Sequence, residues 1–334
     1  MNKQRIGRRA AVLACLGVFL SMNLVADEAP STRIDSGATS RESVTQLPTW
    51  LWGEWSRDWI LRGKVKSSTL DVHYLQTPTY FADIRIPKVR SGISAAKSFA
   101  DLTDQQLRLL AGQDGFTGLT TMAGTVATWS DDIAFQPSDG TPDKGRLERI
   151  PFHRMHELGL DGSYIESWRR RSGAKGRYLV IRVEHSGRLL RTLVVVGNQF
   201  VYVRNRVKDL PMAPSLEALI EAKKATRKEI VGYLDCEFSV GRVRGGSVPW
   251  EIQQSTLPWR EGHHLDFVEQ MSVRDGEAGL VPRAVGDDQW SVPVNTLSPR
   301  DIKALFGGWS GQGCFDSAFP RRARECCAQD DREK

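Results

Sequence analysis

Residues 70–86, LDVHYLQTPTYFADIRI, form the stretch that decides the fold class of this 334-residue chain. They are rich in β-branched and aromatic residues, Thr77-Pro78 interrupts the run in its middle, and Pro87 ends it. Such a composition between turn residues predicts extended strands rather than helices. The same residues also suggest where a binding site lies, because alternate residues of a strand point to opposite faces of its sheet.

The pattern of this stretch recurs on both sides of it. Gly-containing turns such as His185-Ser186-Gly187 separate most of the strand-like runs. Further runs are residues 125–135, 164–170, 178–184, 189–204, 231–243, 250–254, 264–272 and 289–294. Ten or more strands with short turns predict a mostly β fold of antiparallel barrels or sandwiches. Capping and spacing patterns predict only three short helices, near residues 103–112, 214–224 and 298–307.

The N-terminal residues have the composition of a secretory signal peptide. Residues 1–9 hold four basic residues and no acidic one, and an apolar run extends from Ala10 to Ala26 before Asp27. This order predicts cleavage after Ala26 and export to the periplasm or the medium, with no membrane span afterwards. Two alternatives stay open: an uncleaved anchor, and lipidation at Cys15.

Composition and charge narrow the function class. Hydrophobic residues make up 40% and charged residues 26% of the chain, which excludes a disordered, collagenous or multi-span protein. Removal of residues 1–26 lowers the net charge from +6 to +2. The remaining basic clusters are short and adjoin acidic residues, so we expect no nucleic-acid partner. The oligomeric state stays open.

Export would place the cysteines in an oxidising compartment, where disulfides can form. Four remain after cleavage: Cys236, Cys314, Cys326 and Cys327. They are candidates for up to two disulfides, with three possible connectivities, and strain disfavours pairing the adjacent Cys326 and Cys327. The spacing of Cys and His matches no metal site, and no nucleotide-binding motif is present, so neither a metal nor a cofactor is expected.

Four stretches of the chain resemble a largely uncharacterised family of bacterial and fungal proteins related to the yeast Hri-type protein. They are residues 74–87 (YLQTPTYFADIRIP), 112–118 (GQDGFTG), 164–170 (YIESWRR) and 255–261 (STLPWRE). The resemblance spans about residues 50–295 and implies lipocalin-like, or calycin-like, β-barrels with a small-molecule cavity. It implies no catalytic residues.

The resemblance and the composition together predict five segments. Residues 1–26 are the signal peptide and residues 27–46 are a polar linker. Two lipocalin-like barrel domains are predicted over residues 47–145 and 146–297. Residues 298–334 form a short helix and a cysteine-containing tail. Lipocalin-type barrels begin with a Gly-x-Trp motif, which Gly53-Glu54-Trp55 matches; Trp55 is then expected to pack against an arginine such as Arg170.

Strand alternation supplies the candidate ligand-binding residues. In the strand Tyr80–Ile86 one face is apolar, and the other carries an acid and a base beside an aromatic ring. The strand at residues 164–169 puts a carboxylate between two aromatic rings. The candidates are Trp55, Arg57, Tyr74, Gln76, Phe81, Asp83, Arg85, Tyr164, Glu166 and Trp168. The alternatives are a solvent-facing Asp83–Arg85 pair and a structural ion pair of Glu166 with Arg57 or Arg85.

These residues predict an exported barrel protein that binds a small hydrophobic or amphipathic molecule. Aromatic walls would provide most of the affinity, and Asp83, Arg85 or Glu166 would orient the ligand. A second hypothesis is a cofactor-free isomerase, cyclase or hydratase with Glu166 or Asp83 as the acid or base. A third is a periplasmic protein-interaction module whose barrels are filled by side chains. Binding is favoured over catalysis.

Overall fold

The computed structural model describes residues 47–172, 176–273, 280–282 and 286–306. The predicted signal peptide, the linker and three of the four candidate disulfide cysteines (Cys314, Cys326 and Cys327) lie outside these residues. Within them the protein is mostly β, with antiparallel strands and four short α-helices, which confirms the predicted fold class.

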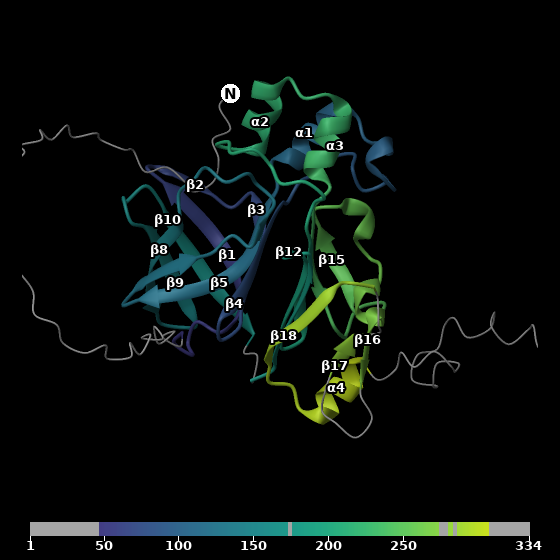
Figure 1. Ribbon diagram of the computed structural model, residues 1–334. Coiled ribbons are helices and arrows are strands. Elements are labelled where there is room, and N and C mark those ends of the chain that lie inside the picture. Colours follow the sequence, from purple (N-terminus) through teal and green to yellow (C-terminus); the bar gives the residue numbers. More distant parts are fainter. Residues whose placement is uncertain (1–46, 173–175, 274–279, 283–285, 307–334) are drawn as a thin grey trace, which may run out of the picture.

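Eight antiparallel strands close into a β-barrel (Figure 1). Closure comes from β10, which pairs with β1 from Glu54 opposite Ser172 to Leu61 opposite Ile165. The short strands β2 (Val65–Ser67) and β7 (Ile133–Ala134) pair with β1 and β5. The barrel strands are β1 (Gly53–Arg62), β3 (Leu70–Gln76), β4 (Tyr80–Pro87), β5 (Asp114–Ala123), β6 (Val126–Trp129), β8 (Asp143–Ile150), β9 (Arg154–Gly159) and β10 (Ile165–Ser172).

A second, six-stranded antiparallel sheet packs beside the barrel. Its order is β15-β14-β13-β12-β11-β18. The strands are β11 (Tyr178–His185), β12 (Arg188–Val196), β13 (Gln199–Arg204), β14 (Glu237–Arg242), β15 (Glu251–Ser255) and β18 (Gln289–Asn295). A separate hairpin joins β16 (Met271–Val273) to β17 (Leu280–Pro282).

The helices are short and lie at the ends of the two sheets (Figure 1). They are α1 (Asp104–Ala111), α2 (Leu216–Lys223), α3 (Arg227–Leu234) and α4 (Pro299–Phe306), with 3-10 turns at Phe99–Asp101, Pro258–Arg260 and Asp266–Gln270. The predicted capping box is confirmed at α1, where the Thr103 hydroxyl accepts from the amide of Gln106 and the Gln106 side chain accepts from the amide of Thr103. No helix among the described residues is long and apolar enough to cross a membrane.

Two of the predicted domain limits differ from the structure. The predicted boundary after residue 145 falls inside the barrel, because β8, β9 and β10 are needed to complete the ring that β10 closes on β1. The second predicted barrel is an open sheet over the described residues, since β15 and β18, at its two edges, do not pair with each other. The barrel therefore extends from Gly53 to Ser172, and the second sheet begins at Tyr178.

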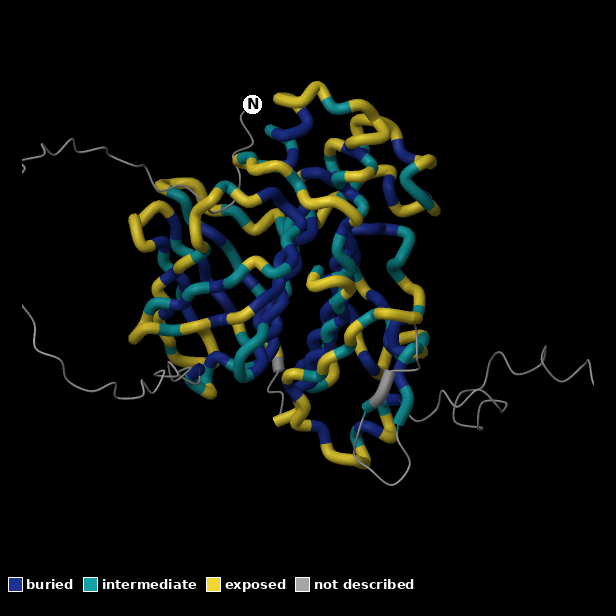
Figure 2. Tube along the Cα trace, in the orientation of Figure 1, coloured by how far each residue is buried: buried dark blue, intermediate teal, exposed yellow. Residues whose placement is uncertain are grey.

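Three hydrophobic clusters form the core, and one of them joins the barrel to the second sheet; buried segments follow the strands on both sides of this contact (Figure 2). Ala82, Ile84 and Ile86 on the outer face of β4 pack with Val194 and Val201 of the second sheet. Phe81 points the other way, into a cluster inside the barrel. The predicted alternation of β4 is therefore confirmed, and it places Asp83 and Arg85 on the barrel's inner side.

Candidate functional site

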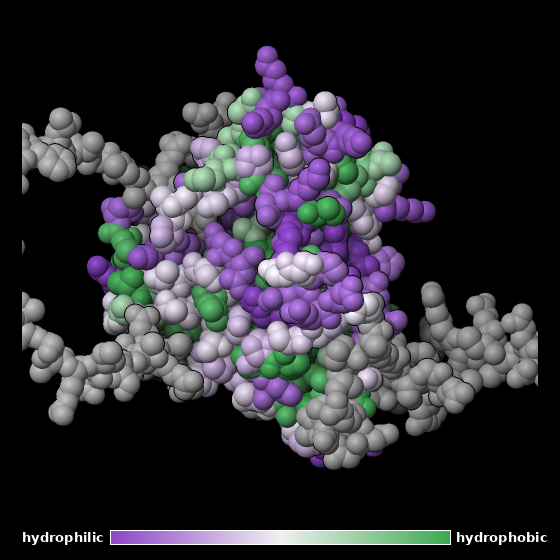
Figure 3. All heavy atoms as spheres, viewed as in Figure 1, coloured by the Kyte–Doolittle hydropathy of each residue, from purple (hydrophilic) through white to green (hydrophobic). Residues whose placement is uncertain are grey.

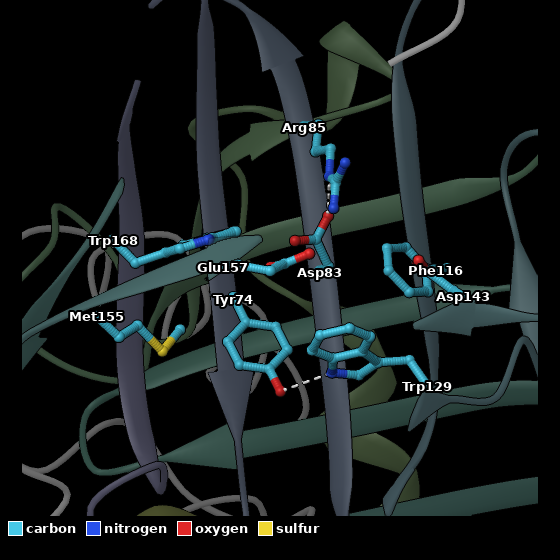
Figure 4. A pocket seen from close by; sticks show the side chains of 9 residues that line it. All are labelled: Tyr74, Asp83, Arg85, Phe116, Trp129, Asp143, Met155, Glu157 and Trp168. Carbon is cyan, nitrogen blue, oxygen red and sulfur yellow. Dashed lines mark hydrogen bonds and ion pairs between the residues drawn. The ribbon is translucent and has the colours of Figure 1, made fainter. Parts of the chain in front are cut away.

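The barrel interior is the candidate site, because all ten predicted binding residues are buried there or at its end. None of them is more than 9% exposed. Four of them, Tyr74, Asp83, Arg85 and Trp168, line one cavity. The other five lining residues were not predicted: Phe116, Trp129, Asp143, Met155 and Glu157. In Figure 4 the nine side chains come from strands all around the barrel and converge on the space between them.

The cavity is small. Its volume is about 20 Å³, which is room for a water-sized group. Aromatic rings fill most of the rest of the interior: the Tyr74 ring lies 5.8 Å from that of Phe81 and 5.9 Å from that of Trp168, and Phe81 lies 5.1 Å from Phe116. These rings therefore leave only a water-sized space inside the barrel.

Two ion pairs stand inside this aromatic wall. Arg85 donates from Nε to Asp83 Oδ1 at 2.7 Å, with the Asp83 side chain only 1% exposed. Burial raises the pKa of Asp83 to about 6, and the adjacent Arg85 guanidinium limits that rise. The second pair joins Arg57 to Glu166, both nearly completely buried. The structure therefore gives Glu166 the structural partner foreseen as the alternative to a free acid or base.

Glu157, on β9, is the carboxyl group with the most unusual environment. Burial raises its pKa well above the usual range, and the nearby carboxylates of Glu166 and Asp143 raise it further. Tyr164 donates its hydroxyl to Glu157 Oε1 at 2.9 Å. Burial and the negative potential of the neighbouring carboxylates thus act in the same direction, and both favour the protonated form of Glu157.

A hydrogen-bond network fixes the opposite wall. Trp129 donates from Nε1 to the Tyr74 hydroxyl at 3.1 Å, as Figure 4 shows, and Tyr74 donates to Gln76 Oε1. Gln76 also accepts from Thr120 at 2.8 Å and donates to the carbonyl of Thr77 at 2.8 Å. The hydrogen-bonding groups of Gln76 are thus engaged within the fold, so it acts by positioning Tyr74.

The Gly-x-Trp motif lies at the start of β1, beside β10. Trp55 donates from Nε1 to the carbonyl of Leu51 at 2.7 Å, and the Arg170 guanidinium lies 6.0 Å from its ring centroid. This confirms the predicted contact. Gly53 has φ +142°, and a Cβ there would lie 2.8 Å from Arg170 Nε. Trp55 belongs to the hydrophobic cluster inside the barrel and does not line the cavity.

An open recess adjoins the cavity on the side of β5, β6 and β8. Its volume is about 380 Å³, and Trp129 and Asp143 border both spaces. These two residues stand opposite each other in the pairing of β6 with β8. The other residues around the recess are Leu119, Thr121, Thr128, Ser130, Asp131, Thr141 and Pro142. A molecule in the recess would thus be separated from the barrel cavity only by the side chains of Trp129 and Asp143.

Two buried polar atoms of the interior have no hydrogen-bond partner among the described residues. They are Trp168 Nε1 and Glu166 Oε2. A buried donor or acceptor without a partner is destabilising, and such groups are common where water or a ligand completes the network. No group of His, Cys, Asp and Glu that could hold a metal ion occurs in the described part of the chain.

Cys236 departs from its predicted role. Its thiol is free, completely buried, and part of the cluster between barrel and second sheet. The structure therefore does not place it in a disulfide. Burial raises its pKa as well, so the thiol stays protonated at neutral pH.

Three of the five missed residues share one cause. Asp143, Met155 and Glu157 lie on β8 and β9, whose outward residues, such as Arg146 and Arg154, are charged and exposed. Charged residues are uncommon in strands, so these short segments lacked a strand signal. Met155, Glu157 and Gly159 stand at every second position, and this period of two was the pattern that could have indicated the strand.

No family model, curated protein or solved structure matches this chain. The class of protein is therefore defined by its fold and site: an antiparallel eight-stranded β-barrel with charged groups inside, joined to a second sheet. The resemblance to the lipocalin-like family stays a prediction.

Proposed function

We propose that this protein binds a small, partly apolar molecule whose polar head enters the barrel cavity. The observation that carries the proposal is the combination of aromatic rings and ionisable side chains around that cavity. Ion pairs inside a core are not needed for stability, because well-packed apolar residues of similar size usually serve as well or better. Their presence beside two unpartnered polar atoms favours a ligand role.

The charge of the lining favours a cationic head group. Two carboxyl groups, Asp83 and Asp143, face one guanidinium, that of Arg85, and the third carboxyl group, Glu157, has a raised pKa that favours its protonated form. Four aromatic rings surround them, and ring faces attract cations, with larger gains where water is excluded. A protonated primary amine suits both features and the size of the cavity, whereas a carboxylate or phosphate would meet like charge.

The volumes of the two spaces indicate that the cavity would hold the head group of such a ligand and the recess would hold its apolar body. The cavity of about 20 Å³ admits the head group alone, and the recess of about 380 Å³ lies within the range of small-molecule sites. The apolar body would lie in the recess, past Trp129 and Asp143. A change of the Trp129 rotamer would join the two spaces and also free the Tyr74 hydroxyl.

Acid–base catalysis at the same site is the second candidate. It is favoured by Asp83, whose pKa is raised to about 6, and by Glu157, whose pKa burial raises well above the usual range. A pair of carboxyl groups that differ in proton affinity can take and return a proton. Glu166 is the weaker choice because Arg57 holds it.

The test is calorimetric titration of the mature protein with matched compounds: phenethylamine, 2-phenylethanol and phenylacetate. Phenethylamine is expected to bind, and Asp143→Asn is expected to weaken its binding about 10-fold or more, the size of one desolvated charge-assisted bond. Asp209→Asn, an exposed carboxylate with an 84% exposed side chain, is the control and should change nothing. Equal binding of the alcohol would contradict the cationic head. Binding by none of the compounds would favour a barrel filled by side chains.

Export is part of the proposal. Residues 1–26 are inferred to direct the chain out of the cytoplasm and to be removed after Ala26. N-terminal sequencing of the protein from its own host would show Asp27 as the first residue, and a retained Met1 would contradict cleavage.

A further inference from the structure

The hairpin that joins β8 to β9 exposes an aromatic side chain on a conformationally unusual turn. Phe152 is 90% exposed, and Phe152 and His153 have φ values of +61° and +57°. Positive φ is unfavourable for bulky residues, and hairpin turns with two such positions strongly prefer Asn and Gly. Folding alone would favour a different sequence here, so the exposed ring calls for another explanation.

The turn is nevertheless well fixed. Ile150 and Arg154 stand opposite each other at its base, and the carbonyl of His153 accepts from the amide of Arg170 at 2.8 Å. The ring of Phe152 is therefore presented from a hydrogen-bonded turn at the end of the barrel.

Arginines surround this turn. Arg154 on β9 stands directly opposite Arg169 on β10, and like charges in that position repel. One carboxylate, Asp58, serves both: it lies 3.5 Å from Arg154 and is paired with Arg169. Arg149 and Arg171 are exposed as well. The four arginines Arg149, Arg154, Arg169 and Arg171 stand beside two acidic residues, Asp58 and the exposed Glu148, which leaves a net charge of +2.

We propose that this basic turn docks on an anionic lipid surface, with Phe152 inserted among the headgroups and the surrounding arginines against lipid phosphates. An aromatic ring beside basic side chains is the composition of protein segments that lie in the membrane interface. Each basic residue near an anionic surface adds to the attraction. A protein partner fits less well, because one ring among arginines offers little of the apolar core that protein interfaces bury.

The rest of the surface supports the choice of this turn. On the face shown in Figure 3, hydrophobic residues form small, separate patches among hydrophilic ones. Among the described residues, the other large apolar side chains that are more than 60% exposed are Val65, Val89, Val207 and Met212, and none is aromatic.

The experiment is co-sedimentation of the mature protein with vesicles of phosphatidylglycerol and phosphatidylcholine, and with vesicles of phosphatidylcholine alone. The wild type is expected to bind the first and not the second. Phe152→Asn should lower the partition coefficient about 10-fold or more, the effect of losing one inserted ring. Phe152→Trp should restore binding. Val207→Asn, at an apolar residue that is 81% exposed, is the matched control and should bind like the wild type.

Folding and binding separate cleanly in this design. Phe152→Asn places a residue that tolerates positive φ in the turn, so its unfolding midpoint should equal or exceed that of the wild type. Arg149→Gln with Arg171→Gln should weaken binding and reduce its dependence on salt. No binding by the wild type, equal binding to both vesicles, or undiminished binding by Phe152→Asn would overturn the proposal.

Discussion

Replacing Arg57 with methionine is expected to destabilise the barrel strongly, because it leaves a carboxylate buried without its partner. The side chains of Arg57 and Glu166 are 4% and 3% exposed, and Glu166 Oε2 already has no hydrogen-bond partner among the described residues. Removing one member of a buried ion pair costs about 3–5 kcal/mol. We therefore expect Arg57→Met to lower the free energy of unfolding by about that amount.

The double variant separates charge from packing. Replacing Arg57 and Glu166 together by methionine removes both buried charges, and such replacements are often neutral or stabilising. It should therefore recover most of the stability that Arg57→Met loses, with a coupling energy of about 2 kcal/mol or more. Arg188→Met is the matched control: its partner Asp209 has an 84% exposed side chain, so the loss should stay below about 1 kcal/mol.

Urea unfolding followed by tryptophan fluorescence would measure these differences, provided that the slope with denaturant is the same for all variants. If Arg57→Met costs no more than Arg188→Met, the pair does not bridge β1 and β10 inside the barrel as described. If the double variant loses the sum of the single losses, the two charges do not interact.

Three further predictions follow from single contacts. Gly53→Ala should destabilise the protein by about 1–3 kcal/mol, because alanine must adopt φ near +142° and its Cβ meets Arg170. A urea midpoint equal to that of the wild type would contradict this close approach. The pKa of Asp83 is about 6 in the folded state and about 3.9 in the unfolded chain, so the folded state binds this proton more tightly. The contribution of Asp83 to the free energy of unfolding therefore falls as the pH rises from about 4 to about 6. Comparison with Asp83→Asn isolates that change, and an unchanged pH profile in the variant would refute it. Cys236 should resist iodoacetamide in the native state and react in urea, as followed by mass spectrometry; rapid native labelling would show that the core between barrel and sheet opens.

Local patterns in the sequence predicted the features that depend on neighbouring residues. Strand alternation put Asp83 and Arg85 on the face opposite Ile84, and the Gly-x-Trp motif predicted the contact of Trp55 with Arg170. The structural alternative for Glu166, an ion pair with Arg57, is also what the structure contains. Each of these features follows from the two-residue period of side-chain direction along a strand or from the attraction between opposite charges.

Features that depend on distant pairing were not predictable in this way. The barrel closes because β10 pairs with β1, which lies more than 100 residues away in the sequence. No residue pattern in either strand identifies the strand with which it pairs. The prediction therefore ended the first domain at residue 145 and separated β9 from the barrel. The unusual environment of Glu157 was not predictable either, because it depends on burial inside the closed barrel and on Glu166 and Asp143, which the fold brings beside it.

The measurement that tests the central proposal most directly is native mass spectrometry of the mature protein purified from its own host. The proposal predicts an added mass from a small molecule with a protonated amine, retained by the wild type and by Asp209→Asn. The same mass should be lost from folded Asp143→Asn. A mass equal to that of the chain alone, unchanged after incubation with a metabolite extract, would contradict ligand binding in the barrel.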